Sequence, residues 1–399
     1  MTIKSFNTFA KSIHLLSLKT LRIGMVTSKD HPNVAPDDHG MIQQLSKLYE
    51  CKSVIWDDYS VQWDQFDLLI IRSAWDYVEK IEQFREWLTK IDSMKIPLLN
   101  DSNVIYWNWN KLYLLELENQ GITIVPSIFV KSCENPISLS DYIQQGFDNG
   151  KFETGQKEFV MKPTIGADSY GTHRFTLESA CLLESQFRKL LKHSDMIIQP
   201  FVDSIHSEGE VSFIFFNKRF SHSIIKHPSP EDFRVQERFG GNVERNTCPA
   251  PSDIEAATKV IKYISGKGRV LYSRIDMLRY KGKLCLSECE LFEPTLYFMN
   301  DEKVIKNFCQ AVADQMGESP RFRGVAPESP RQLLSQPDSP RRSSNSSGSA
   351  PDSPRRSIIQ PDSPRHLPKR IGGSMSRIRC KNSKISAKLR NNNNINDHT

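Results

Sequence analysis

The sequence predicts a small parallel α/β domain over residues 20–105, followed by an α+β part over residues 106–316. Up to residue 105, apolar strands alternate with helix-forming segments, which is typical of a parallel sheet with crossover helices. From residue 123 the predicted strands are separated by longer loops. At residue 317 the composition changes to one that cannot bury enough apolar surface, so we expect a disordered tail over residues 317–399.

The first domain is predicted from its hydrophobic pattern. We expect strands at 21–27, 51–57, 66–76 and 96–100, and helices at 39–50 and 82–95. The helix at 82–95 has the clearest pattern, because Phe84, Trp87, Leu88 and Ile91 recur at helical spacing.

The α+β part should begin with a helix at 110–122. Asn110 is a plausible N-cap and Gly121 a plausible C-cap for that helix. Further helices are expected at 252–264, begun by a Ser252 cap, and near 301–316. Strands are expected in four stretches: "KEFVMKP", "DMIIQPFV", "GEVSFIFFNKRFSHSIIKH" and "RVLYSRIDMLRYKGKLCLSECEL".

The tail carries the basic charge of the chain. Residues 317–399 hold 16 Lys or Arg against 6 Asp or Glu, whereas the whole chain has a net charge of +6. Residues 1–316 are therefore mildly acidic. The tail also repeats Glu-Ser-Pro-Arg and Asp-Ser-Pro-Arg. Three interpretations remain open: phosphorylation by a proline-directed kinase, binding of a protein or an acidic polymer such as nucleic acid, or a soluble linker without a partner.

Composition also bears on the compartment. The eight cysteines form no CxxC pair, and no apolar run is long enough to span a bilayer. These features predict a cytoplasmic protein with reduced thiols and no membrane partner. Residues 1–19 are treated as an N-terminal extension. Their lack of acidic residues leaves a targeting segment as the alternative.

Two glutamates two residues apart suggest a metal site. Glu288 and Glu290 lie in an apolar strand, where alternation places both side chains on one face. Arg274 and Asp276 share a face of the preceding strand, and "YKGK" suggests a hairpin. Asp276 stands opposite Glu288 only if the hairpin loop has an odd number of residues. Three such carboxylates suit Mg²⁺, whereas the alternative is a solvated strand face with salt bridges.

A lysine at the end of another strand suggests a phosphate site. In "FVMKPTIGADSYGT", Lys162 precedes a loop over residues 164–172 that contains Gly166 and Gly171. A lysine there can contact phosphate oxygens, and the glycines allow backbone amides to approach them.

Four further residues are candidates for substrate contact. "RSAWDY" ends a strand of the first domain, where Arg72 is suited to grip a carboxylate and Asp76 lies nearby. The alternative is that Trp75 and Tyr77 pack a domain interface. Lys226 and Arg234 precede "FGG" and face phosphate or a substrate carboxylate, or else are surface charges. His222 and His227 are interpreted as structural.

Taken in order, these motifs resemble the ATP-grasp superfamily across residues 20–316. The set comprises Lys111 before a "GI" turn, the strand-Lys-Pro motif with its small-residue loop, "IIQPFV", "GEVS", Arg-x-Asp and Glu-x-Glu. More narrowly, "IIRSAWDY", "GADSYGT", "FRVQERFGG" and "ECELFEPTLYF" resemble the cycloserine-biosynthesis ligases of the O-ureido-serine cyclo-ligase type.

The resemblance implies an ATP-grasp fold in which two α+β lobes hold ATP. It implies phosphate contacts from Lys111 and Lys162, and closure of the loop that contains Gly166, Ser169 and Gly171. It further implies adenine contacts from the backbone of Gln199, Pro200 and Phe201, a ribose contact from Asp203, and Mg²⁺ ligands in Asp276, Glu288 and Glu290. Many relatives have Asn where Glu290 stands, and the extra charge favours two metal sites or tolerance of Mn²⁺.

The implied chemistry is ligation. Such enzymes phosphorylate a carboxylate to an acyl phosphate, which an amine or similar nucleophile attacks, and Arg274 is the natural stabiliser of the oxyanion. We therefore expect an ATP- and Mg²⁺-dependent ligase acting on a small amino-acid-like carboxylate. The alternatives are a non-catalytic ATP-binding scaffold for the tail, or a ligase acting on a peptide or protein end.

Overall fold

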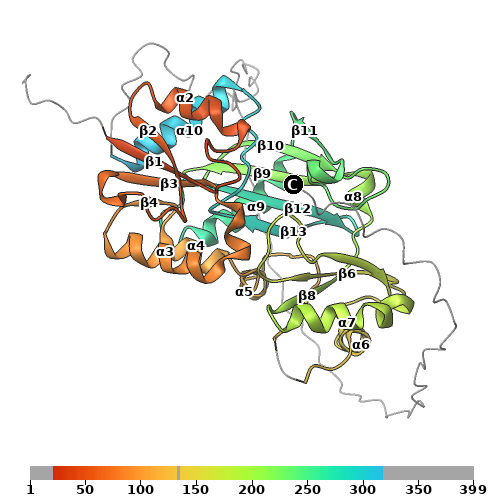
Figure 1. The fold of residues 1–399 in the computed structure, drawn as a ribbon. Helices are drawn as coiled ribbons and strands as arrows, with labels where there is room; N and C mark the ends of the chain where they lie inside the picture. Colours follow the sequence, from red (N-terminus) through yellow and green to blue (C-terminus); the bar gives the residue numbers. More distant parts are fainter. Residues whose placement is uncertain (1–20, 133–134, 318–399) are drawn as a thin grey trace, which may run out of the picture. The chain divides into compact units, whose positions relative to one another are not determined.

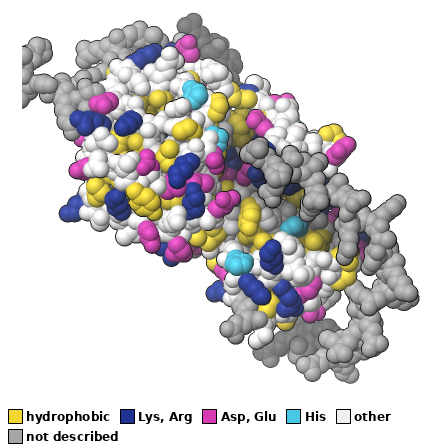
Figure 2. Space-filling view, in the orientation of Figure 1, with side chains coloured by type: hydrophobic (Ala, Val, Ile, Leu, Met, Phe, Trp, Pro, Cys, Tyr) yellow, Lys and Arg dark blue, Asp and Glu magenta, His cyan; other side chains and the backbone are white. Residues whose placement is uncertain are grey.

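The computed structural model describes residues 21–132 and 135–317, and the structural statements below concern these residues (Figure 1). The predicted N-terminal extension and, apart from Gly317, the predicted tail lie outside them. On the face shown in Figure 2, basic and acidic side chains are interspersed rather than gathered into patches of one sign.

The first domain is built on a four-stranded sheet of order β2-β1-β3-β4, in which every pair is parallel. This confirms the predicted parallel α/β architecture. Its strands are β1 (Arg22–Thr27), β2 (Glu50–Ile55), β3 (Leu68–Ser73) and β4 (Leu98–Leu99). Its helices are α2 (His39–Leu45) and α3 (Ile81–Ser93). Short 3-10 helices occupy Pro36–Asp38, Trp63–Gln65 and Trp75–Glu79.

Helices cover both faces of this sheet. α3 buries the predicted residues Phe84, Trp87, Leu88 and Ile91 against one face. The other face is covered by α2 together with α10 (Glu302–Gln315), which returns from the far end of the folded chain (Figure 1). Phe308 of α10 packs against both the first sheet and Phe216 of β9, so the last helix ties the first domain to the third sheet.

Two helices connect the first domain to the rest of the chain: α4 (Ser102–Asn108) and α5 (Tyr113–Asn119). The C-cap of α5 is Gln120, one residue before the predicted Gly121. Gly121 follows it with φ +79°, and its N–H donates to the Glu118 carbonyl. The predicted N-cap Asn110 is wrong. Its side chain accepts a hydrogen bond from Leu112 N in a turn that precedes the helix.

The second sheet has the order β5-β8-β6-β7 and is antiparallel. Its elements are β5 (Ile128–Val130), α6 (Leu139–Asp148), β6 (Glu158–Pro163), β7 (His173–Thr176), the 3-10 helix Leu177–Ser179, α7 (Ala180–Leu191) and β8 (Met196–Pro200). Side chains of α6 and α7 join those of the sheet in one apolar core.

The third sheet has the order β11-β10-β9-β12-β13. Its strands are β9 (Glu210–Phe216), β10 (Arg219–His227), β11 (Asn242–Asn246), β12 (Tyr272–Tyr280) and β13 (Lys283–Glu290). α8 (Ser204–Ser207), the 3-10 helix Glu237–Phe239 and α9 (Pro251–Ile264) complete it. The predicted Ser252 cap is wrong, because α9 begins at Pro251, which suits the first helical position.

The hairpin of β12 and β13 corrects one prediction about register. Its loop has two residues, Lys281 and Gly282, so the stated condition that an odd loop is needed for this alignment is wrong. Asp276 nevertheless pairs with Glu288, because the register shifts after Met277 pairs with Leu286. Ser287 is the extra residue of this β-bulge. The bulge thus restores the alignment that an odd loop would have given.

Candidate active site

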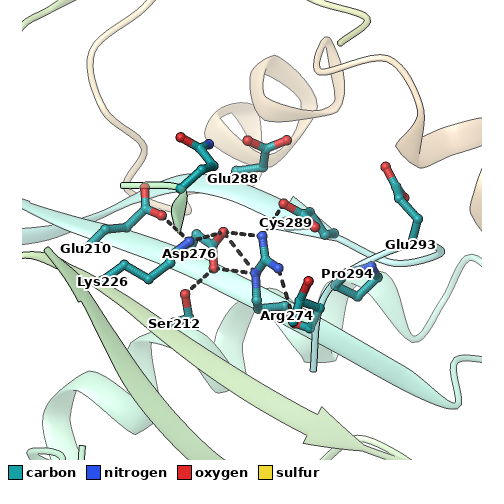
Figure 3. A network of polar contacts seen from close by, with 12 residues as sticks. Glu210, Ser212, Lys226, Arg274, Asp276, Glu288, Cys289, Glu293 and Pro294 are labelled. Atoms are coloured by element: carbon teal, nitrogen blue, oxygen red, sulfur yellow. Dashed lines mark hydrogen bonds and ion pairs between the residues drawn. The ribbon is translucent and has the colours of Figure 1, made fainter. Parts of the chain in front are cut away.

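A polar network lies on one face of the third sheet (Figure 3). β9 and β12 alternate, so one face carries Phe213 and Ile275 into the core beneath α9, while the other carries Ser212, Arg274 and Asp276. The polar side chains therefore gather on the face opposite α9.

Asp276 is the centre of this network. It is 2% exposed. Its Oδ1 accepts from Ser212 Oγ at 2.6 Å, and its Oδ2 lies 3.0 Å from Lys226 Nζ. Arg274 Nε donates to the same carboxylate at 3.0 Å. Burial alone would raise the pKa of Asp276, but Arg274 and Lys226 hold it below its ordinary value. The carboxylate is therefore charged, and both of its oxygens are occupied.

The two cations beside Asp276 are shared with other acids. Lys226 also pairs with Glu210, and Arg274 also pairs with Glu290 and donates to the Thr295 carbonyl at 3.2 Å. Burial would lower the pKa of Lys226, but Asp276 and Glu210 raise it above its ordinary value. Both cations stay charged, and they hold the acidic patch together.

Two lysines from different elements meet at Glu288. Lys111 Nζ lies 2.9 Å from Glu288 Oε1 and donates to the Gly166 carbonyl at 2.6 Å. Lys162, on β6, has no ion pair among the described residues. Burial lowers its pKa, and Lys111 lowers it further against the opposing effect of Glu288. A lysine placed near other charges without a partner of its own is suited to an anionic ligand.

The loop at 164–172 contacts the third sheet's connecting segment. Ser169 Oγ donates to Gln236 Oε1 at 3.0 Å, and Arg238 Nε lies 2.7 Å from Asp168 Oδ2. Asp168 and Ser169 both have positive φ, as does Gly171, where an added Cβ would lie 2.9 Å from Pro163. The loop is thus held in an unusual backbone conformation beside Lys111.

The predicted hinge lies where β8 ends. Gln199 is buried and donates to Ser127 Oγ at 2.8 Å, while Phe201 N donates to the Glu158 carbonyl at 2.8 Å. Pro200 pairs with Phe159 in the sheet, and Asp203 is exposed. The Arg174 guanidinium carbon lies 3.6 Å from the Phe201 ring centroid. The Phe201 backbone N–H is therefore already used inside the sheet, whereas Asp203 is open to a ligand.

Comparisons with known proteins agree with this arrangement. The family model for the N-terminal domain of D-cycloserine synthetase DcsG matches residues 23–100. The cycloserine biosynthesis protein DcsG of Streptomyces lavendulae is 26% identical over 274 residues, which cover 65% of this chain and 87% of that protein. The crystal structure of D-cycloserine synthetase DcsG superposes with a TM-score of 0.65 at 22% identity, covering 74% of this chain and 99% of that one.

D-alanine–D-alanine ligase from Bacillus anthracis has the same architecture, with a TM-score of 0.53 at 15% identity over 75% of this chain and 100% of that one. An ATP-grasp protein with a RimK domain, from Sphaerobacter thermophilus, superposes with a TM-score of 0.51 at 10% identity over 73% of this chain and 99% of that one. This chain has the ATP-grasp fold. The predicted fold and the narrower likeness to cycloserine synthetase are both confirmed. Within the described residues, no helix is long and apolar enough to cross a membrane.

The predicted Mg²⁺ ligands fit the metal only in part. The described residues contain no ready cluster of three metal-ligating side chains. Both oxygens of Asp276 already accept hydrogen bonds from Ser212, Lys226 and Arg274, so Asp276 offers a metal no free oxygen in this structure and its role as a ligand stays a prediction. Glu288 and Glu290 each use only one oxygen in an ion pair, and their side chains are 28% and 22% exposed. Two carboxylates with accessible oxygens suit a hard cation.

Two predicted substrate residues are committed elsewhere. Arg72 is 1% exposed and holds Asp38 through Nε at 3.2 Å and Nη2 at 2.9 Å. Its Nη1 is buried without a hydrogen-bond partner among the described residues. Asp76 accepts from Trp56 Nε1 at 2.7 Å and pairs with Lys80 at 2.8 Å. A ligand would have to break these pairs before it could contact either side chain, so substrate contact stays a prediction.

The alternative interpretation of "RSAWDY" fits the structure instead. Trp75 Nε1 donates to the Glu293 carbonyl at 2.8 Å, and the Tyr77 ring lies 4.9 Å from that of Phe292. Both side chains join the first domain to the segment that follows β13. These two contacts hold that segment against the first domain.

The remaining predicted residues divide. Lys226 belongs to the network at Asp276, as described above. Arg234 instead pairs with Asp232 at 2.6 Å and stacks on Phe239, with its guanidinium carbon 3.5 Å from the ring centroid. It lines a separate pocket beside Phe201 and His206, so the structure does not place it in the network. His222 is buried, with Nε2 2.9 Å from the Leu296 carbonyl oxygen, which fits its predicted structural role.

Sequence reasoning missed Glu293. It lies three residues beyond Glu290, is 7% exposed, and has a carboxylate oxygen, Oε2, without a hydrogen-bond partner. Burial and then the neighbouring Glu290 raise its pKa to about 8, while burial and neighbouring acids raise that of Glu290 to about 7. An acid between Phe292 and Pro294, directly after an apolar strand, was the available signal.

Proposed function

We propose that this ATP-grasp protein is an ATP-dependent ligase that activates a small amino-acid-like carboxylate. The observation that carries the proposal is the meeting of Lys111 and Lys162 with Glu288, Glu290 and Arg274 at one place. It agrees with the likeness to DcsG over 87% of that protein's length. The alternatives, a non-catalytic scaffold or a ligase acting on a peptide or protein end, are not favoured by any observation.

The proposed reaction has two steps. A substrate carboxylate oxygen attacks the γ-phosphorus of ATP, which forms an acyl phosphate and releases ADP. An amine or similar nucleophile then attacks the acyl carbon, and inorganic phosphate leaves with the electrons of the C–O bond. Neither step needs a redox partner. The protein contributes mainly position and neutralisation of charge.

The residues present suit these tasks. Lys162 and Lys111 neutralise phosphate oxygens, and Lys111 exchanges its pair with Glu288 for phosphate when ATP binds. Glu288 and Glu290 would hold Mg²⁺ or Mn²⁺, and the bound ion would offset the negative charge of the phosphates. Arg274, fixed by Asp276, stands ready to stabilise the oxyanion of the tetrahedral step. Asp203 and the loop at Gly166, Ser169 and Gly171 enclose the rest of the nucleotide.

Release of ADP tests this proposal. The full chain is incubated with ATP and Mg²⁺, or Mn²⁺, against single amino acids, O-substituted serines and short peptides. We expect release that depends on a free amino acid or O-substituted serine, and loss of that release in Arg274→Lys. ADP release with peptides alone would support a peptide ligase. ATP binding without release for any probe would support a scaffold. We place the enzyme in the cytoplasm, where ATP is available.

A further inference from the structure

Glu293 is a buried acid for which the proposed mechanism has no use. Its side chain follows β13 and points to the same side of the sheet as Glu288 (Figure 3). No ion pair involves it among the described residues, and Oε2 is buried without a hydrogen-bond partner. A buried acceptor left unsatisfied is rare in folded proteins and calls for an explanation.

The position of Glu293 is fixed by the first domain. Trp75 Nε1 donates to the Glu293 carbonyl at 2.8 Å, and Arg72 Nη2 donates to the next carbonyl, that of Pro294, at 3.0 Å. The Tyr77 hydroxyl hydrogen-bonds to the Glu293 carboxyl group. The carboxyl group is thus held by one hydrogen bond from Tyr77, while its other oxygen, Oε2, has no hydrogen-bond partner.

Glu293 lies among other acids and has no cation paired with it among the described residues. Glu290 and Glu288 are the acids that raise its pKa, and Lys111 is the cation that opposes them. Lys111 is already paired with Glu288 and bonded to the Gly166 carbonyl. The raised pKa of Glu293 has the same cause, because burial and Glu290 act on a carboxyl group without a cation of its own. A cation supplied by a ligand would relieve this.

We propose that Glu293, positioned by Tyr77, binds the ammonium group of the substrate amino acid. This inference rests on the proposed function and names the feature by which the substrate is selected. An amino acid carries a carboxylate and an ammonium group on the same carbon. The carboxylate is drawn to the guanidinium group of Arg274, and the ammonium group is drawn to Oε2 of Glu293. The site therefore selects α-amino acids over acids that lack the amino group.

The test compares two probes that differ only in that group: O-ureido-D-serine and its des-amino analogue, 3-(ureidooxy)propanoic acid. Each is titrated by calorimetry into the full chain saturated with Mg²⁺ and a non-hydrolysable ATP analogue. We expect the wild-type protein to bind the amino acid about 10- to 100-fold more tightly than the analogue, the range for a hydrogen bond between charged groups. Glu293→Gln, which retains an acceptor for Tyr77, should bind both equally weakly.

Two further variants complete the design. Tyr77→Phe leaves the carboxyl group but removes its support, so we expect a smaller loss of discrimination. Glu302→Gln, at a side chain that is 85% exposed, should behave as wild type. Should Glu293→Gln fail to fold, which its melting curve with Mg²⁺-ATP would reveal, Tyr77→Phe decides alone.

Equal discrimination in wild type and Glu293→Gln would overturn the inference, as would wild-type protein that binds neither probe. Binding does not require turnover. Preferential binding of the amino acid without ADP release would therefore sustain the Glu293 subsite while contradicting the proposed ligase.

Discussion

Two ionic sites within the described residues differ in how fully their charges are paired. At Arg72 and Asp38, the guanidinium holds one carboxylate through several hydrogen bonds, and both side chains are at most 3% exposed. At the end of β13, Glu288 and Glu290 each use one oxygen, and Glu293 leaves Oε2 unpaired. The fully paired site therefore stabilises the fold, whereas the partly paired site still has oxygens that can bind a ligand.

Breaking the paired site should have the largest effect on stability. Asp38→Asn keeps the size of the side chain but leaves the Arg72 charge buried without its partner. We expect the free energy of unfolding to fall by about 3–5 kcal/mol, as is typical when one half of a buried pair is removed. Urea unfolding measures it. The exposed pair of Glu82 and Arg85 supplies the control, because Glu82→Gln should change stability by less than about 0.5 kcal/mol. A similarly small change in Asp38→Asn would contradict the structural role.

His222 is another buried group with a structural role. Burial lowers its pKa to about 4 from 6.5, so the folded protein keeps it neutral while the unfolded chain takes up a proton below about pH 6.5. Stability should therefore fall as the pH drops from 6.5 towards 4. Between pH 7 and pH 5 the share from His222 is about 2 kcal/mol. His222→Gln should lose this share of the slope in urea unfolding at the two pH values. An unchanged slope would show that the ring is already protonated or exposed.

On the ligand side, Lys162 offers a substitution that should spare stability. Lys162→Ala removes a cation with no ion pair among the described residues, so the fold should stay intact. The loss of one charge-assisted contact should weaken ATP binding by about 1.5–3 kcal/mol, which is roughly 10- to 150-fold. Calorimetry with Mg²⁺-ATP measures this. Lys151→Ala, whose partner Glu118 lies outside the site, is the control. Unchanged affinity in Lys162→Ala would refute the phosphate assignment.

The smallest expected effect concerns the tail. Every residue proposed to contact nucleotide lies before residue 317. A chain ending at Gly317 should therefore bind Mg²⁺-ATP with a Kd within about twofold of that of the full chain. Loss of even one contact worth about 1.4 kcal/mol would raise the Kd tenfold. A larger loss would place part of the nucleotide site in the tail.

Local pattern predicted most of the fold, because the spacing of apolar residues in α3 and the alternation in β13 are properties of short segments. It also placed Glu288 and Glu290 on one face. It did not predict the bulge at Ser287, since one extra residue in a strand leaves no periodic signal. Nor did it predict that α10 returns to cover the first sheet.

The pairing of charges at the site could not be predicted, for a common physical reason. Whether a charged side chain is free depends on partners that are distant in sequence, such as Asp38 for Arg72, and Ser212 and Lys226 for Asp276. Sequence reasoning identifies the type of charge at a position. It does not show which charges are already paired, and that pairing separates Glu293 from Asp276.

We propose that Glu288 and Glu290, the partly paired carboxylates of β13, bind the metal–nucleotide complex. Glu288→Gln tests it most directly, by thermal melts with and without Mg²⁺-ATP. Repulsion among the acids alone would make the ligand-free variant as stable as wild type or slightly more so. The variant also loses the ion pair between Glu288 and Lys111, which costs more than the relieved repulsion, so we expect a slightly lower melting temperature without ligand.

Glu118→Gln is the matched control, because it also removes a lysine's partner at a side chain that is 28% exposed. A ligand that binds only the folded state raises the melting temperature. The account predicts a clear rise with Mg²⁺-ATP in wild type and in Glu118→Gln, and almost none in Glu288→Gln. An equal rise in all three proteins would mean that the glutamates of β13 are only a solvated strand face.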